Sequence, residues 1–331
     1  MIPTLPRVSV IVPAYGVAHL VGESLASLQA QTMTDWECIV IDDGAPDDVA
    51  GAVAPFLSDP RIRFLATANH GVSGARNRAI REARAPLIAL LDGDDRFRPT
   101  YLETTVGLLE SDSTLRLVTC NALQFGAIAH ECLCVERPAN APHPRLGSLS
   151  QVIDRSFNVY IGTTFRHADF DAVGGFDETM AQSEDFDFWV RLMMLGGQAY
   201  YVDAALGDYR IRPGSASASI VRMILGNIKV YEKAAKALPA DAPEQAVLRA
   251  TIASSRSALG LEYAIDRIID GDVTLGLSEL REHAHRLHGL KWRAFFALWR
   301  FAPALAQPML GWRRQMHSRG ATRLQLLRRR G

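Results

Sequence analysis

The chain has 331 residues, of which 48% are hydrophobic, and it carries 36 acidic and 36 basic side chains. These values exclude a disordered protein, and the length predicts a large α/β domain with an appended unit rather than one small core. Residues 1–7 lack the apolar core of a signal peptide, and no apolar run reaches the roughly 18 residues of a membrane span. We therefore expect the folded part of the chain to be cytoplasmic.

Strands and helices alternate along the first hundred residues. Their hydrophobic periodicity predicts, in chain order, strand 8–12, helix 19–31, strand 37–41, helix 48–57, strand 61–65, helix 74–84 and strand 86–91. This alternation is the pattern of a mostly parallel, doubly wound sheet, in which ligands bind beyond the carboxyl ends of the strands. Three segments lie at such ends: Pro13-Ala14-Tyr15, Asp42-Asp43 and Asp92-Gly93-Asp94-Asp95.

The next part of the chain is less regular. A strand-like run at 115–125 is followed by a segment with three prolines, 136–148, which predicts a mobile loop. Strand-like residues return at 198–211 and end before the turn Arg212-Pro213-Gly214-Ser215. We therefore expect the sheet to extend to about this turn.

Beyond Ile220 the composition changes to one rich in Ala, Leu and Arg. This composition predicts long helices at 244–270 and 274–288. We therefore expect two parts, an α/β domain of residues 1–218 and a helical region of residues 219–331.

Carboxylates gather in three places along the chain. The turn at 92–95 suits Mg²⁺ or Mn²⁺, because these ions prefer carboxylate oxygens and need only one or two of them beside substrate phosphates. The alternative is a solvated acidic turn. Asp43 can accept a hydrogen bond from a nucleotide base, or can belong to an ordinary turn. Glu184 and Asp185 begin a predicted helix whose dipole keeps them ionised, although helix capping explains them equally well.

Seven segments, taken together, resemble the family 2 glycosyltransferases, which have the GT-A nucleotide-sugar fold. They follow the family's order: Val8-Ser9-Val10-Ile11-Val12-Pro13-Ala14-Tyr15, Ser24 to Thr32, Ile41-Asp42-Asp43-Gly44, Gly71-Val72-Ser73-Gly74-Ala75-Arg76-Asn77, Leu91 to Asp95, Gly174 to Glu178 with Glu184-Asp185, and Tyr209-Arg210. The resemblance runs from Val8 to about Ser219, nearly two thirds of the chain. Each segment alone is weak, but the shared order makes a chance match improbable.

The resemblance implies roles on the donor side of a site. Pro13, Ala14 and Tyr15 would line the nucleoside pocket, and Asp43 would bind the base, most often uracil in this family. Arg76 would face the nucleotide.

The resemblance also implies the residues of the chemistry. Asp92 would approach the ribose, while Asp94 would be the main ligand for Mn²⁺ or Mg²⁺ in a DXD motif. Asp185 would be the general base, because an acceptor hydroxyl is a poor nucleophile until a carboxylate takes its proton. Attack from the face opposite the departing diphosphate inverts the anomeric configuration, and the metal would stabilise that diphosphate.

The sequence departs from the family's pattern in two places. Ala45 stands where many relatives have Ser, and Arg212 follows Tyr209-Arg210 where many relatives have a His that helps to hold metal or diphosphate. Arg212 cannot coordinate a cation, but it can pair with diphosphate oxygens. We also expect Glu184 and Trp189, with Arg212, on the acceptor or diphosphate side of the site.

The C-terminal segment, residues 290–331, has a distinct composition. From His283 onward there are eleven Lys and Arg residues and no acidic residue, whereas residues 1–282 carry 25 basic and 36 acidic side chains. Aromatic residues lie among the arginines, as in interfacial membrane segments, and Pro303 and Pro308 would break one long helix. A helical cap with a solvated basic end is the alternative, and no recognised motif supports nucleic-acid binding. We therefore expect peripheral binding to an anionic membrane, at the inner face of the cell membrane.

With the resemblance, the sequence predicts an inverting, metal-dependent transferase. It would move a sugar from a nucleotide-diphosphate donor, a UDP-sugar, to a hydroxyl of a glycan or lipid-linked acceptor in cell-envelope polysaccharide synthesis. A sugar nucleotidyltransferase usually has a Gly-rich loop with a basic residue, which Pro13-Ala14-Tyr15-Gly16 lacks. A non-catalytic carbohydrate-binding relative would not need all of Asp43, Asp92, Asp94 and Asp185.

Overall fold

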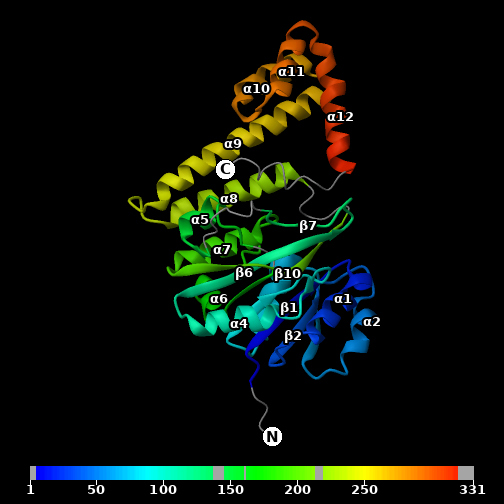
Figure 1. The fold of residues 1–331 in the computed structure, drawn as a ribbon, viewed down its shortest axis with the longest axis vertical. Coiled ribbons are helices and arrows are strands. Elements are labelled where there is room, and N and C mark those ends of the chain that lie inside the picture. Colours follow the sequence, from blue (N-terminus) through cyan, green and yellow to red (C-terminus); the bar gives the residue numbers. More distant parts are fainter. Residues whose placement is uncertain (1–4, 137–144, 160–161, 213–218, 320–331) are drawn as a thin grey trace. The chain divides into compact units, whose positions relative to one another are not determined.

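The structure is a computed structural model that describes residues 5–136, 145–159, 162–212 and 219–319. The chain divides into two compact units, Met1–Arg212 and Pro213–Gly331. In the described residues, the first unit contains all of the strands and the second contains helices alone (Figure 1).

The first four strands form the parallel half of one sheet. They are β1 (Val8–Ala14), β2 (Trp36–Asp42), β3 (Ile62–Ala66) and β4 (Leu87–Leu90), and they lie side by side in the order β3-β2-β1-β4. All residues of β4, and all of β2 except the last, are buried, as expected for parallel strands covered on both faces. The four predicted strands are confirmed within two residues at each end.

The other half of the sheet mixes strand directions. It continues from β4 through β9 (Thr163–Arg166), β6 (Leu115–Gly126) and β10 (Gln198–Ile211) to β5 (Arg96–Phe97). Strand β10 runs parallel to β6, whereas β9 is antiparallel to both β4 and β6, and β5 is antiparallel to β10. Two short strands, β7 (Cys132–Leu133) and β8 (Leu146–Gly147), pair with β6 and β10. The sheet is thus mostly parallel, as predicted, with antiparallel insertions that the sequence did not indicate.

Helices pack beside the sheet. They are α1 (Ala18–Gln29), α2 (Val49–Val53), α3 (Gly71–Arg81) and α4 (Tyr101–Ser111). Of these, α3 packs against β1 and β2, and α4 packs against β6 and β9. The helix predicted at 48–57 is shorter, because Pro55 has no backbone N–H to donate and the chain continues as the 3-10 turn η1 (Ala54–Phe56). The helix predicted at 74–84 begins earlier, at Gly71, so that the motif around Arg76 lies inside α3.

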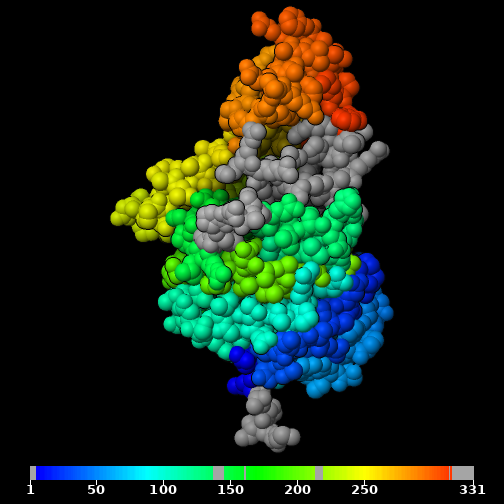
Figure 2. Space-filling view, in the orientation of Figure 1, coloured from blue at the N-terminus to red at the C-terminus, as the bar shows by residue number. Residues whose placement is uncertain are grey.

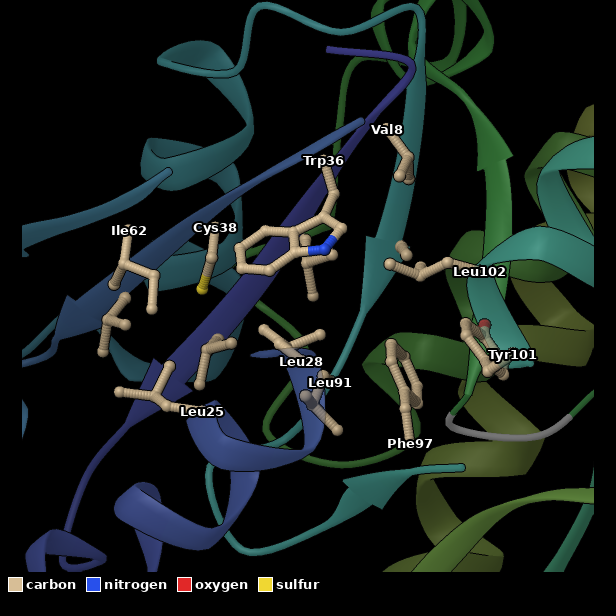
Figure 3. Packing of buried hydrophobic residues seen from close by; sticks show 14 of the residues in the cluster. Val8, Leu25, Leu28, Trp36, Cys38, Ile62, Leu91, Phe97, Tyr101 and Leu102 are labelled. Atoms are coloured by element: carbon tan, nitrogen blue, oxygen red, sulfur yellow. The ribbon is translucent and has the colours of Figure 1, made fainter. Parts of the chain in front are cut away.

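A hydrophobic core fills the space between α1, α4 and one face of the sheet. Figure 3 shows Leu25 and Leu28 of α1 next to Trp36 of β2, with Leu91 and Phe97 beyond them. Alternate residues of β1 also belong to this cluster, as the two-residue period of a strand requires. The carboxyl ends of β1, β2 and β4 are therefore held on a rigid support.

A second packed region is rich in aromatic rings and involves α5 (Leu149–Ile153), α6 (His167–Val173) and α7 (Glu184–Met194). The ring centroids of Phe176 and Phe188 are 4.1 Å apart, and those of Phe165 and Trp189 are 5.7 Å apart. Only 2% of Trp189 is exposed. Trp189, expected on the acceptor side of the site, is therefore a core residue that fixes α7.

The loop predicted at 136–148 lies mainly outside the described residues, which resume at Arg145. Its described end is regular: Leu146–Gly147 forms β8, and Ser148 caps α5 in a capping box with Gln151. For this end the prediction of a loop is wrong, because the cap and the strand pairing supply local hydrogen bonds.

The described part of the second unit is helical. Its elements are α8 (Ile220–Ala237), α9 (Glu244–Ile269), α10 (Val273–Glu282), η3 (Ala284–Arg286), α11 (Leu290–Phe301), η4 (Pro303–Leu305) and α12 (Ala306–Arg319). The helix predicted at 244–270 is confirmed, whereas the one predicted at 274–288 ends earlier, at Glu282. In the residues described, no helix has both the length and the hydropathy to cross a membrane.

A separate core holds the last four helices together. Ile268, Leu280, Trp299 and Leu310 are buried in it, and Figure 2 shows the orange-to-red side chains of this region packed against one another. Pro303 begins the 3-10 turn between α11 and α12, as predicted. The second predicted break is wrong, because Pro308 lies in the first turn of α12, where its missing N–H is not needed.

Candidate active site

The turn that follows β4 lies directly against the end of β1. A Cβ atom added to Gly93 would be 3.0 Å from the carbonyl oxygen of Pro13 and 3.1 Å from a methyl carbon of Val17. A residue with a Cβ would force the end of β1 to shift by a few tenths of an ångström, so glycine suits this close approach. The close approach brings Asp92 and Asp94 beside the loop that follows β1.

Two other elements hold the same turn from either side. Ser24 of α1 donates its hydroxyl hydrogen to the carbonyl oxygen of Asp95, at 2.7 Å. From β10, the backbone N–H of Arg210 donates to Oδ1 of Asp95 at 2.7 Å, and Nε of Arg210 donates to the carbonyl oxygen of Asp94 at 2.8 Å. The end of β1, helix α1 and strand β10 thus together fix the position of the turn that carries Asp92, Asp94 and Asp95.

Arg76 joins the end of β4 to the beginning of α7. Its guanidinium nitrogens lie 2.8 Å from Oδ1 of Asp92 and 3.2 Å from Oε1 of Glu184. Only 3% of Arg76 is exposed. Burial tends to lower the pKa of this guanidinium, but Asp92 and Glu184 outweigh it, so that the pKa is raised and the charge is secure.

A second ion pair neutralises the carboxylate expected to bind metal. Nε of Arg212 lies 2.5 Å from Oδ2 of Asp94. We refer to Asp92, Asp94, Asp95, Glu184 and Asp185 as the acidic rim. Two of its members, Asp92 and Asp94, are therefore each paired with an arginine from a distant segment.

The acidic rim favours added positive charge. Burial raises the pKa of Asp94, the neighbouring Asp92 raises it further, and Arg212 offsets this only in part. Burial, followed by the charges of Asp92 and Asp94, raises the pKa of Asp95 well above its usual range. Burial, followed by repulsion from Asp185, also raises the pKa of Glu184. A proton, an arginine or a metal ion would each relieve this repulsion.

Asp185, the predicted general base, lies half-buried in the first turn of α7. Ser183 precedes this turn with a left-handed backbone, at a φ of 60°, which is uncommon for a residue other than glycine. The sharp turn places Glu184 and Asp185 at the positive end of the helix dipole, where carboxylates are stabilised. Asp187, one turn along, is instead buried and paired with Arg191.

Asn77 is a positioning residue that the sequence did not single out. Its Nδ2 donates to the carbonyl oxygen of Phe176 at 2.9 Å, and its Oδ1 accepts the N–H of Phe176 at 2.8 Å. A Cβ on Gly175 would be 2.7 Å from Oδ1 of Asn77, so the glycine permits this contact. Asn77 and Arg76 are adjacent on α3, which thereby holds both the loop before α7 and the start of that helix.

The predicted nucleoside pocket lies beside β1 and β2. The backbone N–H of Asp43 donates to the carbonyl oxygen of Ala14 at 3.3 Å, so these segments are neighbours. Tyr15 is 54% exposed and Pro13 is partly exposed, whereas Ala14 is fully buried and can line a pocket only through its backbone. That Pro13, Ala14 and Tyr15 line a nucleoside pocket stays a prediction.

Asp43 is 3% exposed, and its Oδ1 accepts the N–H of His70 at 2.9 Å. The loop after β1 is held by Asp47, whose carboxylate accepts the N–H groups of Gly16 and Ala18 at 3.1 and 2.6 Å. Asp47 was not predicted, because it follows the motif in an ordinary turn sequence. These contacts fix the loop that carries Tyr15.

Whether the acidic rim could bind a metal ion depends on the oxygen ligands that it supplies. In the part of the chain that is described, no group of three or more His, Cys, Asp or Glu side chains is arranged to hold one. Asp92 and Asp94 nevertheless supply hard oxygen ligands, and Mg²⁺ or Mn²⁺ needs only one or two of these when substrate phosphates complete its shell. The rim thus fits such an ion, provided that Arg212 yields its place on Asp94.

Comparison with known sequences covers the whole site. The profile described as Glycosyl transferase family 2 matches residues 9–121, and the profile described as Glycosyl transferase family group 2 matches residues 87–224. Together these stretches contain every carboxylate and arginine of the site.

Two relatives from Escherichia coli match parts of the chain. Chondroitin synthase is 28% identical over 195 residues, which are 58% of this chain and 27% of that protein. UDP-Glc:alpha-D-GlcNAc-diphosphoundecaprenol beta-1,3-glucosyltransferase WfgD is 37% identical over 103 residues, 31% of this chain and 40% of that protein. Each match thus spans less than half of the relative's length.

A solved structure matches over nearly the whole chain. The mannosyltransferase PcManGT from Pyrobaculum calidifontis, in complex with GDP-Man and Mn²⁺, has a TM-score of 0.62 and 20% identity, with 93% of this chain and 87% of that chain covered. This likeness concerns the fold, and it confirms the predicted GT-A architecture with a helical C-terminal region. The two profile matches, which together span residues 9–224, identify the chain as a family 2 glycosyltransferase.

Proposed function

We propose that this glycosyltransferase is an inverting enzyme that transfers a sugar from a UDP-sugar to a hydroxyl group of a glycan or lipid-linked acceptor. The observation that carries the proposal is the ion bridge Asp92–Arg76–Glu184. It links the turn expected to hold the donor to the helix that carries the expected base, Asp185. A donor and an acceptor bound on either side of this bridge would meet at one place.

The donor side is formed by the ends of β1, β2 and β4. In this proposal Asp43 accepts a hydrogen bond from the base, Tyr15 covers the nucleoside and Asp92 approaches the ribose. Asp94, with Asp92, would hold Mn²⁺ or Mg²⁺, and such an ion would stabilise the charge of the departing diphosphate. Arg76 fixes the orientation of Asp92 through their 2.8 Å ion pair.

The acceptor side is formed by the start of α7. Asp185 takes the proton of the acceptor hydroxyl as that oxygen bonds to the anomeric carbon of the sugar. The bond between the anomeric carbon and the diphosphate oxygen breaks on the opposite face, and its electron pair leaves with the diphosphate. The configuration at the anomeric carbon is therefore inverted.

The relatives support the substrate classes of the proposal. The name of WfgD includes a UDP-sugar donor and a diphosphoundecaprenol acceptor, and chondroitin synthase makes a polysaccharide by its name. The structural neighbour binds GDP-Man with Mn²⁺. We infer a role in cell-envelope polysaccharide synthesis with a UDP-sugar as the donor. A GDP-sugar is the alternative donor, and an experiment must distinguish the two.

The surface of the second unit supports peripheral binding to an anionic membrane. Leu290 and Phe301 of α11 are 81% and 86% exposed, and Trp312 of α12 is 63% exposed. Arg293 and Arg300 are exposed on the same helix, and no acidic residue follows Glu282 in the sequence. Apolar side chains flanked by arginine suit the boundary between lipid headgroups and acyl chains. A membrane-bound enzyme would meet a lipid-linked acceptor at the surface where that acceptor lies.

The proposal is tested by a panel of UDP- and GDP-sugars with Mn²⁺. We expect one UDP-sugar to raise the melting temperature, because a ligand that binds only the folded state stabilises it. The same donor should release nucleoside diphosphate slowly in water. A response to GDP-sugars alone would overturn the uracil assignment, and no response to any donor would overturn the proposed activity.

A further inference from the structure

The end of β10 brings two arginines to the acidic rim, and they differ in what they contact. Arg210 is engaged by its backbone, its Nε and its Nη2, the last of which lies 2.7 Å from Glu23. Arg212 makes one ion pair within the described residues, at 2.5 Å to Asp94. Its side chain is 33% exposed, compared with 14% for Arg210. Arg210 is therefore part of the support, whereas Arg212 has freedom to move.

Arg76 differs from Arg212 in the same way as Arg210 does. The Arg76 side chain is 4% exposed and bridges two carboxylates, so moving it away from Asp92 would break a largely buried ion pair in a fixed bridge. The Arg212 side chain is 33% exposed, and within the described residues Asp94 is its one ion-pair partner. Of the two arginines that neutralise the rim, Arg212 is the one that can be displaced at small cost.

We propose that Arg212 is a displaceable internal cation, which holds Asp94 in the donor-free protein and moves to the donor diphosphate when a divalent metal ion takes Asp94. The inference rests on the proposed function and extends it. It makes metal binding conditional on the nucleotide.

The physical reason is competition for one carboxylate. A guanidinium nitrogen at 2.5 Å from Oδ2 occupies a position beside the oxygen that a metal ion would bind, and the two positive charges would repel each other. A diphosphate offers Arg212 a better partner, because guanidinium and phosphate oxygens form paired, charge-assisted hydrogen bonds. The nucleotide therefore removes the competitor of the metal ion, and each ligand strengthens the binding of the other.

The experiment measures Mn²⁺ affinity by electron paramagnetic resonance of the free ion, with and without UDP or GDP. In the wild type we expect weak binding of Mn²⁺ alone and an increase of about tenfold or more when the nucleotide is added, within the usual range of coupling between sites. In Arg212→Gln, Mn²⁺ alone should bind about tenfold more tightly, and the nucleotide should add little.

Two further variants separate competition from other effects. Arg212→Lys keeps the charge and should bind Mn²⁺ alone as weakly as the wild type does. Arg116→Gln removes an arginine of similar exposure, paired with Asp169 at 2.9 Å, and should also behave as the wild type does. Circular dichroism of each variant checks that the fold is retained.

Three results would overturn the inference. The first is equal affinity of the wild type and Arg212→Gln for Mn²⁺ alone, and the second is tight binding by Arg212→Lys. The third is a gain in Arg116→Gln as large as in Arg212→Gln, which would indicate net charge rather than competition. If no variant bound either nucleotide, with or without Mn²⁺, the proposed function itself would fail and this inference with it.

Discussion

The acidic rim of the first unit and the basic face of the second use charged residues in opposite ways. In the rim, Asp92 and Asp94 are each paired with an arginine from another segment, at 2.8 and 2.5 Å. On α11, Arg293 and Arg300 lie exposed beside apolar side chains, in a stretch of sequence without any acid. The carboxylates of the rim are thus partly neutralised by arginines, whereas Arg293 and Arg300 of α11 have no ion pair within the described residues.

This difference in charge pairing predicts how strongly amino-acid substitutions should affect each region. The buried part of the rim depends on Arg76, because removing this arginine takes away the shared partner of Asp92 and Glu184. A surface that binds through area and net charge loses affinity in small, nearly additive steps. Single substitutions should therefore be severe in the rim and graded on α11, and four predictions test this contrast.

The largest expected effect is that of Asp185→Asn. The amide cannot take the acceptor proton, so turnover of the donor should fall by about 10²- to 10⁴-fold while the affinity for the donor is unchanged. Nucleoside diphosphate release and calorimetric binding measure the two quantities. Asp171→Asn, at an exposed position on α6, is the control. Normal turnover in Asp185→Asn would refute the assignment of the base.

The next effect is on stability. Arg76→Met removes the shared partner of Asp92 and Glu184, and we expect the free energy of unfolding to fall by about 3 kcal/mol or more. Arg98→Met, at an arginine that is 39% exposed and paired with Asp208, should cost less than about 1 kcal/mol. Urea denaturation measures both. An equal fall in the free energy of unfolding for the two variants would contradict the assignment of Arg76 as the residue that joins Asp92 to Glu184.

The basic face should show a smaller and graded effect. Leu290→Ser with Phe301→Ser removes two exposed apolar side chains, each of which contributes about 1.5–3 kcal/mol when buried. Partitioning onto anionic vesicles, measured by sedimentation at low salt, should fall by at least about tenfold. Leu57→Ser, at a 45% exposed leucine of the first unit, is the control and should have no effect. If the wild-type protein did not sediment with the vesicles, a membrane partner would be contradicted. Release of the bound protein on addition of nucleic acid would also argue against a membrane partner.

The smallest effect concerns pH and lies at Glu37, near the amino-terminal end of β2 and away from the rim. Burial by itself raises the pKa of Glu37, but hydrogen bonds from Ser9 and Arg84 outweigh it, and the net pKa is lowered. A carboxyl whose pKa is lower in the folded state stabilises the fold above its unfolded pKa. The melting temperature should therefore fall as the pH drops below about 4.5, and less steeply in Glu37→Gln. Equal slopes for the two proteins would contradict this source of acid sensitivity.

Much of the fold follows from local sequence patterns. Strands β1, β2 and β4 were predictable because each is a short apolar run that ends in a turn or acidic residue. Strand β9 was not, because Thr163–Arg166 contains one apolar residue and becomes a strand by pairing antiparallel with β4 and β6. Such pairing depends on contacts between distant segments, which local periodicity does not report.

The sequence indicated the candidate residues of the site, but it did not indicate which of them form ion pairs with one another. Asp92, Asp94 and Asp185 stood out as carboxylates at the ends of predicted elements. The ion pair between Arg212 and Asp94, and the burial of Arg76 between two carboxylates, arise only when remote strands and helices meet. Trp189 was misplaced because an aromatic residue beside acids in the sequence resembles a sugar-binding residue, whereas on α7 it faces the core.

The most direct test of the central claim is the rate at which nucleoside diphosphate is released from the preferred donor with Mn²⁺. Asp94→Asn keeps the shape of the side chain but removes the charge at the centre of the rim. It should reduce this rate by at least about a hundredfold, and Asp35→Asn, at an exposed position of the same unit, should leave it unchanged. Release from Asp94→Asn at the wild-type rate would contradict the assignment of the rim as the donor site.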